Sequence, residues 1–457
     1  MGVFLLVLIV VVALLAAVHR YVWQRLVRDV TKPGGLPRRL GTAALVVLPL
    51  LFVAAMASSR LGAPFPLQQA VAWPGYLWPA LLLYVTLALL VGEAVRPALR
   101  GWLARRDART AGPSPAPVPE PLPASVPEPV PASVPGAASA PEPPSAAPAA
   151  PEKPASAVPD EPGPAGPASA PAGEKPPVAP AEVSRRLFVS RVVGGTAAAV
   201  AAGTVGYGTY GVLRGPRIKR VTVPLAKVPR AAHGYRIAVV SDVHLGPILG
   251  RAHTQRIVDA VNSAQPDLIA VVGDLVDGTV ADLGSAAEPL ARLRARHGSF
   301  FVTGNHEYFS GADAWVDHVR ELGLRPLRNE RLEIPAGFDL AGVDDIAGES
   351  QGQGPDFAKA LGDRDRARAA VLLAHQPVVV HDAVRHGVDL QLSGHTHGGQ
   401  LWPGNLIAGL ANPTLAGLER YGDTQLYVSR GAGAWGPPVR VGAPSDITIV
   451  QLASKQA

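Results

Sequence analysis

The hydrophobic pattern divides the chain into an apolar N-terminal part and a C-terminal part where short apolar runs alternate with polar segments. Three apolar runs without charged residues, 3–18, 42–58 and 76–91, approach the length needed to cross a hydrocarbon core of about 30 Å. A fourth run, rich in Gly and Ala, covers 192–213. The pattern therefore predicts four transmembrane helices, three of them within residues 1–111.

Basic residues beside these runs predict how the chain crosses the membrane. The loop after the first run and the stretch after the third are rich in Arg, whereas residues 60–75 contain a single Arg. The positive-inside rule places the Arg-rich stretches in the cytoplasm, and chain continuity then places the C-terminal part outside. We therefore expect a multi-pass protein of the cell membrane with an extracytoplasmic C-terminal domain. Basic residues after the fourth run favour the opposite orientation: Arg214, Arg217, Lys219 and Arg220.

A low-complexity segment separates the third and fourth runs. Residues 112–183 are mainly Pro, Ala, Ser and Glu, a composition that buries too little apolar surface to fold and predicts a disordered spacer. Within residues 184–213, Arg185 and Arg186 precede Leu187 and the Gly/Ala-rich run, which resembles a twin-arginine export signal. The alternative is an ordinary fourth transmembrane helix with a basic flank. The first run is not flanked like a signal peptide, because no basic segment precedes it.

Residues 221–457 predict one globular α/β domain. Helical spacing predicts helices over 253–264, 288–296 and 312–322. Short Val/Ile-rich runs predict strands at 236–241, 267–272, 299–303, 331–334, 338–343, 370–373, 389–392, 425–429 and 447–452. Helices alternate with strands at first and strands dominate later, which indicates two packed sheets with helices outside, a four-layer αββα sandwich.

The amino-acid composition excludes several kinds of site and partner. The 457 residues include no cysteine, which excludes disulfides and thiolate metal sites. The formal net charge of +6 arises largely from basic residues beside the apolar runs, so we expect the membrane, and not a nucleic acid, as the stable partner. Composition leaves the oligomeric state open. The apolar runs contain no charged residue, which argues against a transport pathway.

Five short polar blocks follow predicted strands in the C-terminal domain, where side chains from distant parts of a chain can converge. They contain two carboxylates, one amide and four imidazoles that together suit a pair of divalent transition metals. These residues are Asp242, His244, Asp274, Asn305, His375, His395 and His397. Two such ions can clamp the attacking and leaving oxygens of a phosphate ester, so the pattern favours a hydrolase. Mn, Fe, Zn and Co all fit these ligands.

At these residues the chain resembles the calcineurin-like metallophosphoesterase superfamily. The order D-x-H, G-D-x-x-D, G-N-H-E, H and G-H-x-H is complete, and strings such as SDVHLG and LSGHTHGGQ are similar to its membrane-associated bacterial phosphodiesterase branch. The resemblance implies that one metal binds Asp242, His244 and His397, and a second binds Asn305, His375 and His395. It further implies that Asp274 bridges the metals and that His306 is catalytic without binding metal.

These observations predict a membrane-anchored phosphoesterase that hydrolyses phosphate esters, with diesters expected, through a metal-activated hydroxide. Two alternatives stay open: a phosphomonoesterase or pyrophosphatase acting on nucleotides or lipid headgroups, and a non-catalytic metal-binding envelope protein. Asp277 and Glu307, in the same blocks, are either groups that orient the ligands or solvated turn residues.

Overall fold

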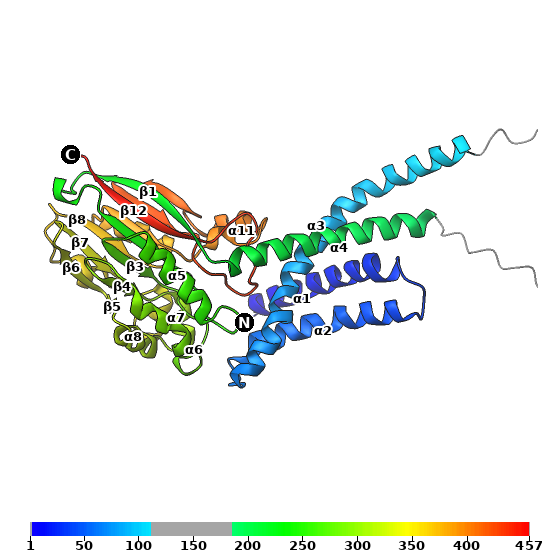
Figure 1. Ribbon diagram of the computed structural model, residues 1–457, viewed down its shortest axis with the longest axis horizontal. Coiled ribbons are helices and arrows are strands. Elements are labelled where there is room, and N and C mark those ends of the chain that lie inside the picture. Colours follow the sequence, from blue (N-terminus) through cyan, green and yellow to red (C-terminus); the bar gives the residue numbers. More distant parts are fainter. Residues whose placement is uncertain (1, 111–184, 457) are drawn as a thin grey trace, which may run out of the picture. The chain divides into compact units, whose positions relative to one another are not determined.

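The computed structural model describes residues 2–110 and 185–456, so the predicted spacer at 112–183 lies outside the described residues. Residues 2–102 and 185–456 belong to one compact unit. Four long helices cover the predicted apolar runs: α1 (Gly2–Trp23), α2 (Leu36–Ser58), α3 (Phe65–Thr110) and α4 (Arg185–Leu213) (Figure 1). Each contains a segment long and apolar enough to cross a membrane. A short π-helix, η1 (Gln24–Arg28), continues α1.

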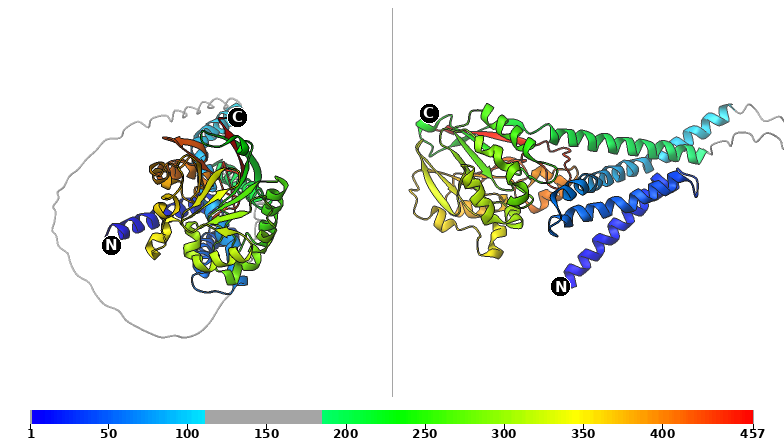
Figure 2. Two further views of the ribbon diagram at one scale, coloured as in Figure 1. Left: turned by 90° about the vertical axis from the view of Figure 1, so that its left-hand side faces the viewer. Right: turned by 60° about the horizontal axis from the view of Figure 1, so that its bottom comes forward.

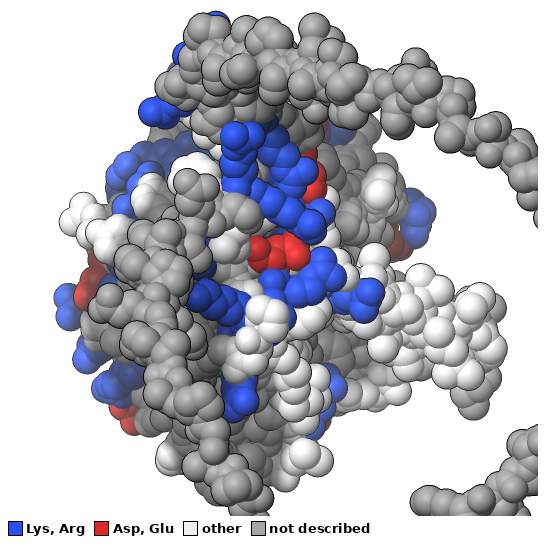
Figure 3. All heavy atoms as spheres, turned by 90° about the vertical axis from the view of Figure 1, so that its right-hand side faces the viewer, with Lys and Arg blue, Asp and Glu red and all other residues white. Residues whose placement is uncertain are grey.

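The helices extend beyond the apolar runs, most of all α3, because backbone hydrogen bonds continue through polar residues. Where α1 and η1 approach α3, charges pair: Arg25 Nε lies 2.9 Å from Glu93 Oε1, and Arg25 Nη1 lies 3.0 Å from Asp29 Oδ2. Basic side chains also surround a small acidic group on the face drawn in Figure 3. The first charged residues beyond the apolar runs are therefore partly neutralised by one another.

After α4 ends at Leu213, the chain enters β1 (Arg217–Leu225) four residues later (Figure 2). The strand begins before residue 221, where sequence analysis placed the start of the domain. Its first half carries alternating basic residues, which hid the strand pattern. β1 pairs in parallel with β12 (Asp446–Ser454), with Arg217 opposite Asp446 and Leu225 opposite Ser454. The end of the membrane region is therefore joined to the final strand of the domain.

Two six-stranded mixed sheets form the centre of the domain. The first has the order β1-β12-β2-β3-β4-β5. Its remaining strands are β2 (Arg236–Val240), β3 (Leu268–Val272), β4 (Ser299–Val302) and β5 (Arg325–Pro326). The second has the order β10-β11-β9-β8-β7-β6. Its strands are β6 (Glu330–Ile334), β7 (Phe338–Gly342), β8 (Ala369–Leu373), β9 (Leu390–Ser393), β10 (Gly417–Tyr421) and β11 (Thr424–Val428).

Side chains of both sheets form one buried core, in which Ile237 and Val239 of the first sheet join Phe338 and Val371 of the second. A second core packs the other face of the first sheet against α5 (Arg251–Ser263), α6 (Val280–Ala287) and α8 (Ala312–Glu321). A third places α9 (Phe357–Leu361) and α10 (Val380–Arg385) on the second sheet. The predicted αββα layering is therefore confirmed (Figure 1).

Helices were predicted less accurately than strands. The α-helix expected over 288–296 is not formed. Helix α6 ends at Ala287, and a 3₁₀ turn, η3 (Glu288–Arg292), follows it. Pro289 has no backbone N–H, so the α-helical hydrogen bonds cannot continue through it. The predictions omitted α6, α7 (Asn305–Ser310), α9, α10 and α11 (Gly404–Ala411), which are too short to show a helical period.

Candidate metal centre

The predicted ligands follow the ends of neighbouring strands, as expected. Asp242 comes after β2, Asp274 after β3, Asn305 after β4, His375 after β8 and His395 after β9. Strong backbone strain marks the same positions, because five of the seven predicted ligands have a positive φ. These five are Asp242, His244, Asp274, His395 and His397, with φ between 49° and 72°. Non-glycine residues adopt this conformation at a cost, and such strain concentrates at functional sites.

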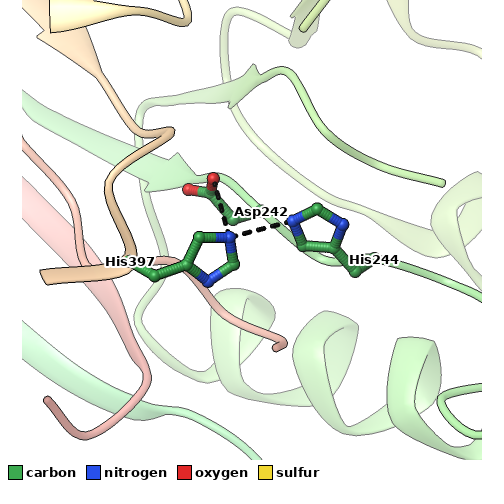
Figure 4. A group of neighbouring side chains, drawn as sticks. All are labelled: Asp242, His244 and His397. Atoms are coloured by element: carbon green, nitrogen blue, oxygen red, sulfur yellow. Dashed lines mark hydrogen bonds and ion pairs between the residues drawn. The ribbon is translucent and has the colours of Figure 1, made fainter. Parts of the chain in front are cut away.

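Asp242, His244 and His397 form the first cluster (Figure 4). His244 Nε2 and His397 Nε2 are 3.0 Å apart, and His397 Nε2 is 3.5 Å from Asp242 Oδ1. All three side chains are buried, and Asp242 Oδ2 has no hydrogen-bond partner among the described residues. A buried, unpaired carboxylate oxygen is costly unless a cation binds it. Burial and then Arg440 lower the pKa of His397 well below its usual value, which favours the neutral ring a metal requires.

Asp274, His375 and His395 form the second cluster, with Asn305 beside it. His375 Nδ1 donates to Val272 O at 2.8 Å, which directs Nε2 toward Asp274 Oδ2, 3.1 Å away. Although burial acts to lower the pKa of His375, Asp274 raises it well above its usual value. A proton thus lies where a cation would bind, and metal binding would displace it. His395 Nδ1 lies 2.9 Å from Asn305 Oδ1.

Asp274 lies between the two clusters. Its Oδ2 is 3.1 Å from His375 Nε2 in the second cluster and 3.8 Å from His244 Nε2 in the first. The same oxygen is 4.0 Å from His306 Nε2, and His244, Asp274 and His306 form a third group of neighbouring ligand atoms. All seven predicted ligands and His306 therefore meet at one place.

Asp277 joins two of these histidines. Its Oδ1 accepts from His244 Nδ1 at 2.8 Å and lies 2.7 Å from His306 Nδ1, so the Nε2 atoms of both rings point toward Asp274. Burial acts to raise the pKa of Asp277, but His244 and His306 lower it to about 2. Burial acts to lower the pKa of His306, but the hydrogen bond and charge of Asp277 raise it to about 9. Asp277 is therefore an orienting group and not a solvated turn residue.

Glu307 fixes the backbone that carries the ligands. Its fully buried carboxylate accepts three backbone N–H groups, those of Asp274 at 3.0 Å, Leu275 at 2.8 Å and Gly304 at 2.6 Å. Burial and the charge of Asp274 raise the pKa of Glu307 to about 7. A Cβ on Gly304 would overlap Asp274, so this loop can approach only as glycine. The sequence left the role of Glu307 open, and these contacts exclude a solvated turn residue.

Three residues that contact the site histidines were not predicted from the sequence. Arg440 is buried beside His397, and its Nη1 donates to His397 O at 2.9 Å. The rings of Phe309 and Trp435 lie beside His306, with centroids 5.6 Å and 6.0 Å from it. Phe309 follows His306 by three residues on α7, which is the only sequence signal for it. Arg440 and Trp435 lie in Gly/Pro-rich segments after β11 that contain no recognisable metal motif.

Comparison with known proteins agrees with this geometry. Residues 235–399 match the family model described as calcineurin-like phosphoesterase. An uncharacterized metallophosphoesterase of Aquifex aeolicus is 35% identical over 243 residues, which cover 52% of this chain and 92% of that protein. The chain belongs to the calcineurin-like metallophosphoesterase family. The resemblance to the superfamily is thereby confirmed.

Two further relatives of this metallophosphoesterase come from a vertebrate and a bacterium. A Danio rerio protein named transmembrane protein with metallophosphoesterase domain is 39% identical over 264 residues, covering 55% of this chain and 60% of that one. An uncharacterized metallophosphoesterase of Helicobacter pylori is 39% identical over 251 residues, covering 54% of this chain and 67% of that one. The chain thus spans about three fifths of the first vertebrate relative.

Members of this family use a dinuclear metal centre, and the family model covers residues 235–399 of this chain. Its residues fit that centre: carboxylate, amide and imidazole ligands converge in two clusters around a shared carboxylate, and a buried oxygen of Asp242 lacks a hydrogen-bond partner among the described residues. Six histidines of this domain lie outside the motifs, and among the described residues none belongs to such a cluster. They are His233, His253, His297, His318, His381 and His386.

Proposed function

We propose that this chain is a membrane-anchored phosphodiesterase with two divalent metals. The observation that carries the proposal is the position of Asp274 Oδ2, 3.1 Å and 3.8 Å from histidines of the two clusters and 4.0 Å from His306. Two metal positions and a proton donor can therefore act on one phosphate group.

In this proposal Asp242, His244 and His397 hold the first metal, and Asn305, His375 and His395 hold the second. Asp274 contributes to both. When bound, the two cations lower the pKa of a water molecule and neutralise charge on the phosphate. Asn305 is a neutral ligand, which limits negative charge at a site that must accept an anion.

His306 acts as the general acid. The short contact with Asp277 keeps Nδ1 protonated and leaves Nε2 directed at the centre, where a leaving oxygen would lie. With a pKa of about 9, the ring is cationic at neutral pH and holds the proton that the leaving oxygen needs. Asp277 therefore positions His306 and His244 together, which couples proton donation to metal binding.

We expect diesters over monoesters, because the motif strings SDVHLG and LSGHTHGGQ are similar to the membrane-associated bacterial phosphodiesterase branch. A phosphomonoesterase or pyrophosphatase is the competing outcome of the test below.

The four apolar helices support a multi-pass anchor with the catalytic domain outside the cytoplasm. The paired arginines Arg185 and Arg186 begin α4, which supports export through a twin-arginine route with the domain already folded. Protease protection in spheroplasts tests the orientation. The proposed orientation is contradicted if protease added to intact spheroplasts leaves the catalytic domain uncut and digests it only after lysis.

Activity is tested with the full-length protein in detergent. We expect hydrolysis of bis(p-nitrophenyl) phosphate with Mn²⁺, slower hydrolysis of p-nitrophenyl phosphate, and two metals per chain by elemental analysis. Asp274→Ala should abolish turnover because one carboxylate serves both metals. Val384→Ala, on the exposed side of α10, is the matched control and should leave turnover unchanged. A protein that folds but retains no metal under metal-replete conditions would refute the proposal.

A further inference from the structure

An uncharged apolar surface lies next to the candidate metal centre. Helix α11 begins seven residues after His397, its eight residues are all described, and none is buried (Figure 1). Leu406, Ile407 and Leu410 are 65%, 74% and 89% exposed. No charged residue occurs between Gly398 and Leu418. Large apolar side chains grouped on an exposed helix mark an interaction site.

Aromatic side chains connect this helix to the catalytic residues. Trp402, directly before α11, is 53% exposed, and Trp435, beside His306, is 54% exposed. Gln400 links the two segments, because its Nε2 donates to Trp435 O at 2.8 Å and its Oε1 accepts from Trp435 N at 3.0 Å. We call Trp402, Leu406, Ile407 and Leu410 the apolar rim. The rim is therefore joined to the segment that carries Trp435, whose ring centroid lies 6.0 Å from that of His306.

The base of the rim is attached to the apolar helices. Tyr84 of α3 donates its hydroxyl to Trp402 O at 2.9 Å. Leu401 packs against the buried cluster that contains Trp78 of α3 and Val205 of α4. Tyr84 lies eight residues into the predicted span 76–91, about 12 Å along a helix. One leaflet contributes about 15 Å of hydrocarbon, so this contact places the rim at the depth of a leaflet.

We propose that the apolar rim inserts into the leaflet on the catalytic side, and that the substrate is a phosphoester of a membrane lipid. This inference rests on the proposed phosphodiesterase function. The occupant is a bilayer, and not a second protein, because the rim is continuous with helices that are themselves long and apolar enough to cross a membrane.

The reaction on such a lipid is hydrolysis. Water forms a new P–O bond, the P–O bond to the leaving alcohol breaks, and His306 donates a proton to the leaving oxygen. The proton released by water restores His306 through solvent. The lipid chain stays in the leaflet throughout, so only the phosphate has to reach the metal centre.

Two substrates with one chromophore test the inference. The full-length protein is given phosphatidyl-p-nitrophenol in phosphatidylcholine nanodiscs or methyl p-nitrophenyl phosphate in solution. Hydrolysis of either substrate releases p-nitrophenolate. In Leu406→Ser/Ile407→Ser/Leu410→Ser, we expect the ratio of lipid to soluble turnover to fall at least about tenfold, because inserted apolar area sets interfacial binding. Val378→Ser/Val384→Ser, exposed apolar residues elsewhere on the domain, is the control and should keep the wild-type ratio.

The outcomes separate the two proposals. Hydrolysis of the soluble diester without hydrolysis of the lipid overturns the lipid inference and leaves the phosphodiesterase intact. A wild-type ratio in the triple variant also overturns it. Failure to hydrolyse either ester refutes the phosphodiesterase function, and the lipid inference falls with it.

The absence of cysteine from the sequence allows a direct measurement of insertion. In the Leu410→Cys variant of the full-length protein, the new cysteine is labelled with an environment-sensitive fluorophore. The labelled protein is reconstituted with brominated phosphatidylcholine, and Val384→Cys, labelled in the same way, is the matched control. We expect bromine quenching at position 410 and water-like emission at 384. Water-like emission at position 410 contradicts insertion. Emission shielded from water but unquenched by bromolipid identifies a protein occupant, which also overturns the inference.

Discussion

Replacing Asp277 by Asn removes one negative charge while keeping the size of the side chain. The carboxylate contacts His244 Nδ1 at 2.8 Å and His306 Nδ1 at 2.7 Å, and an amide oxygen can still accept at this position. The main loss is therefore the charge that raises the pKa of His306 to about 9. Without it, only the charges of Asp274 and Glu307 oppose burial, and the pKa falls toward its ordinary value of about 6.5.

The sign of the effect follows from the role of His306. A general acid is active when protonated, so turnover declines as pH rises through its pKa. At about pH 8 the protonated fraction falls from about 90% with a pKa of about 9 to about 3% with a pKa of about 6.5. We therefore expect a roughly thirtyfold loss of kcat/KM at that pH, and an alkaline limb displaced about 2.5 units toward lower pH.

The assay compares two leaving groups across the pH range. A diester with an alkyl leaving group needs the proton and should show the full loss, whereas a p-nitrophenyl diester, whose leaving group is stable as an anion, should change little. Metal content, measured alongside, should stay at the wild-type level. An unmoved alkaline limb for the alkyl ester refutes this account of His306. Equal losses for both esters, accompanied by lost metal, would show that Asp277 acts through His244 instead.

Three other substitutions test separate parts of the structure. His306→Ala should lower turnover of alkyl esters by about 10²–10⁴-fold with metal content retained; metal lost in elemental analysis would make His306 a ligand. Gly394→Ala should lose metal and activity, because its Cβ would overlap Ser241 Oγ and Asp242 Oδ2; Gly409→Ala in α11, where the Cβ meets open space, should keep both. Phe338→Ala, fully buried between the sheets, should cost about 3–5 kcal/mol of unfolding free energy in denaturant titrations, and a cost under about 1 kcal/mol would contradict the two-sheet core.

The sequence was informative where the chemistry is local. The buried strands are short Val/Ile-rich runs, and their predicted limits agree with the structure to within about two residues, because burial on both faces produces a continuous apolar run. The ligands follow those strands within a few residues, so each motif could be placed at a strand end. The resemblance to the family, which rests on the same residues, is confirmed by the relatives.

The parts that the sequence did not show depend on long-range contacts. Arg440 lies 43 positions after His397 in sequence and touches it only because the segment after β11 folds back on the site. The function of Glu307 rests on three backbone N–H groups, which carry no side-chain signature. β1 was missed because basic residues occupy three of its first four positions, and its place in the sheet comes from pairing with β12, more than 220 positions away. Pairing at such distance is set by the fold and not by the local pattern.

Backbone strain gives the site its rigidity. Five ligand positions hold a left-handed backbone, each at a cost of order 1–3 kcal/mol, so the surrounding structure must stabilise them. Buried carboxylates do so through hydrogen bonds: Glu307 accepts the N–H of Asp274, and Asp242 Oδ1 accepts the N–H of His395. The carboxylates thus fix the loops of neighbouring strands as well as facing the metal positions. Removing a metal should therefore leave the ligands in place, whereas removing Glu307 should release the loop that carries Asp274.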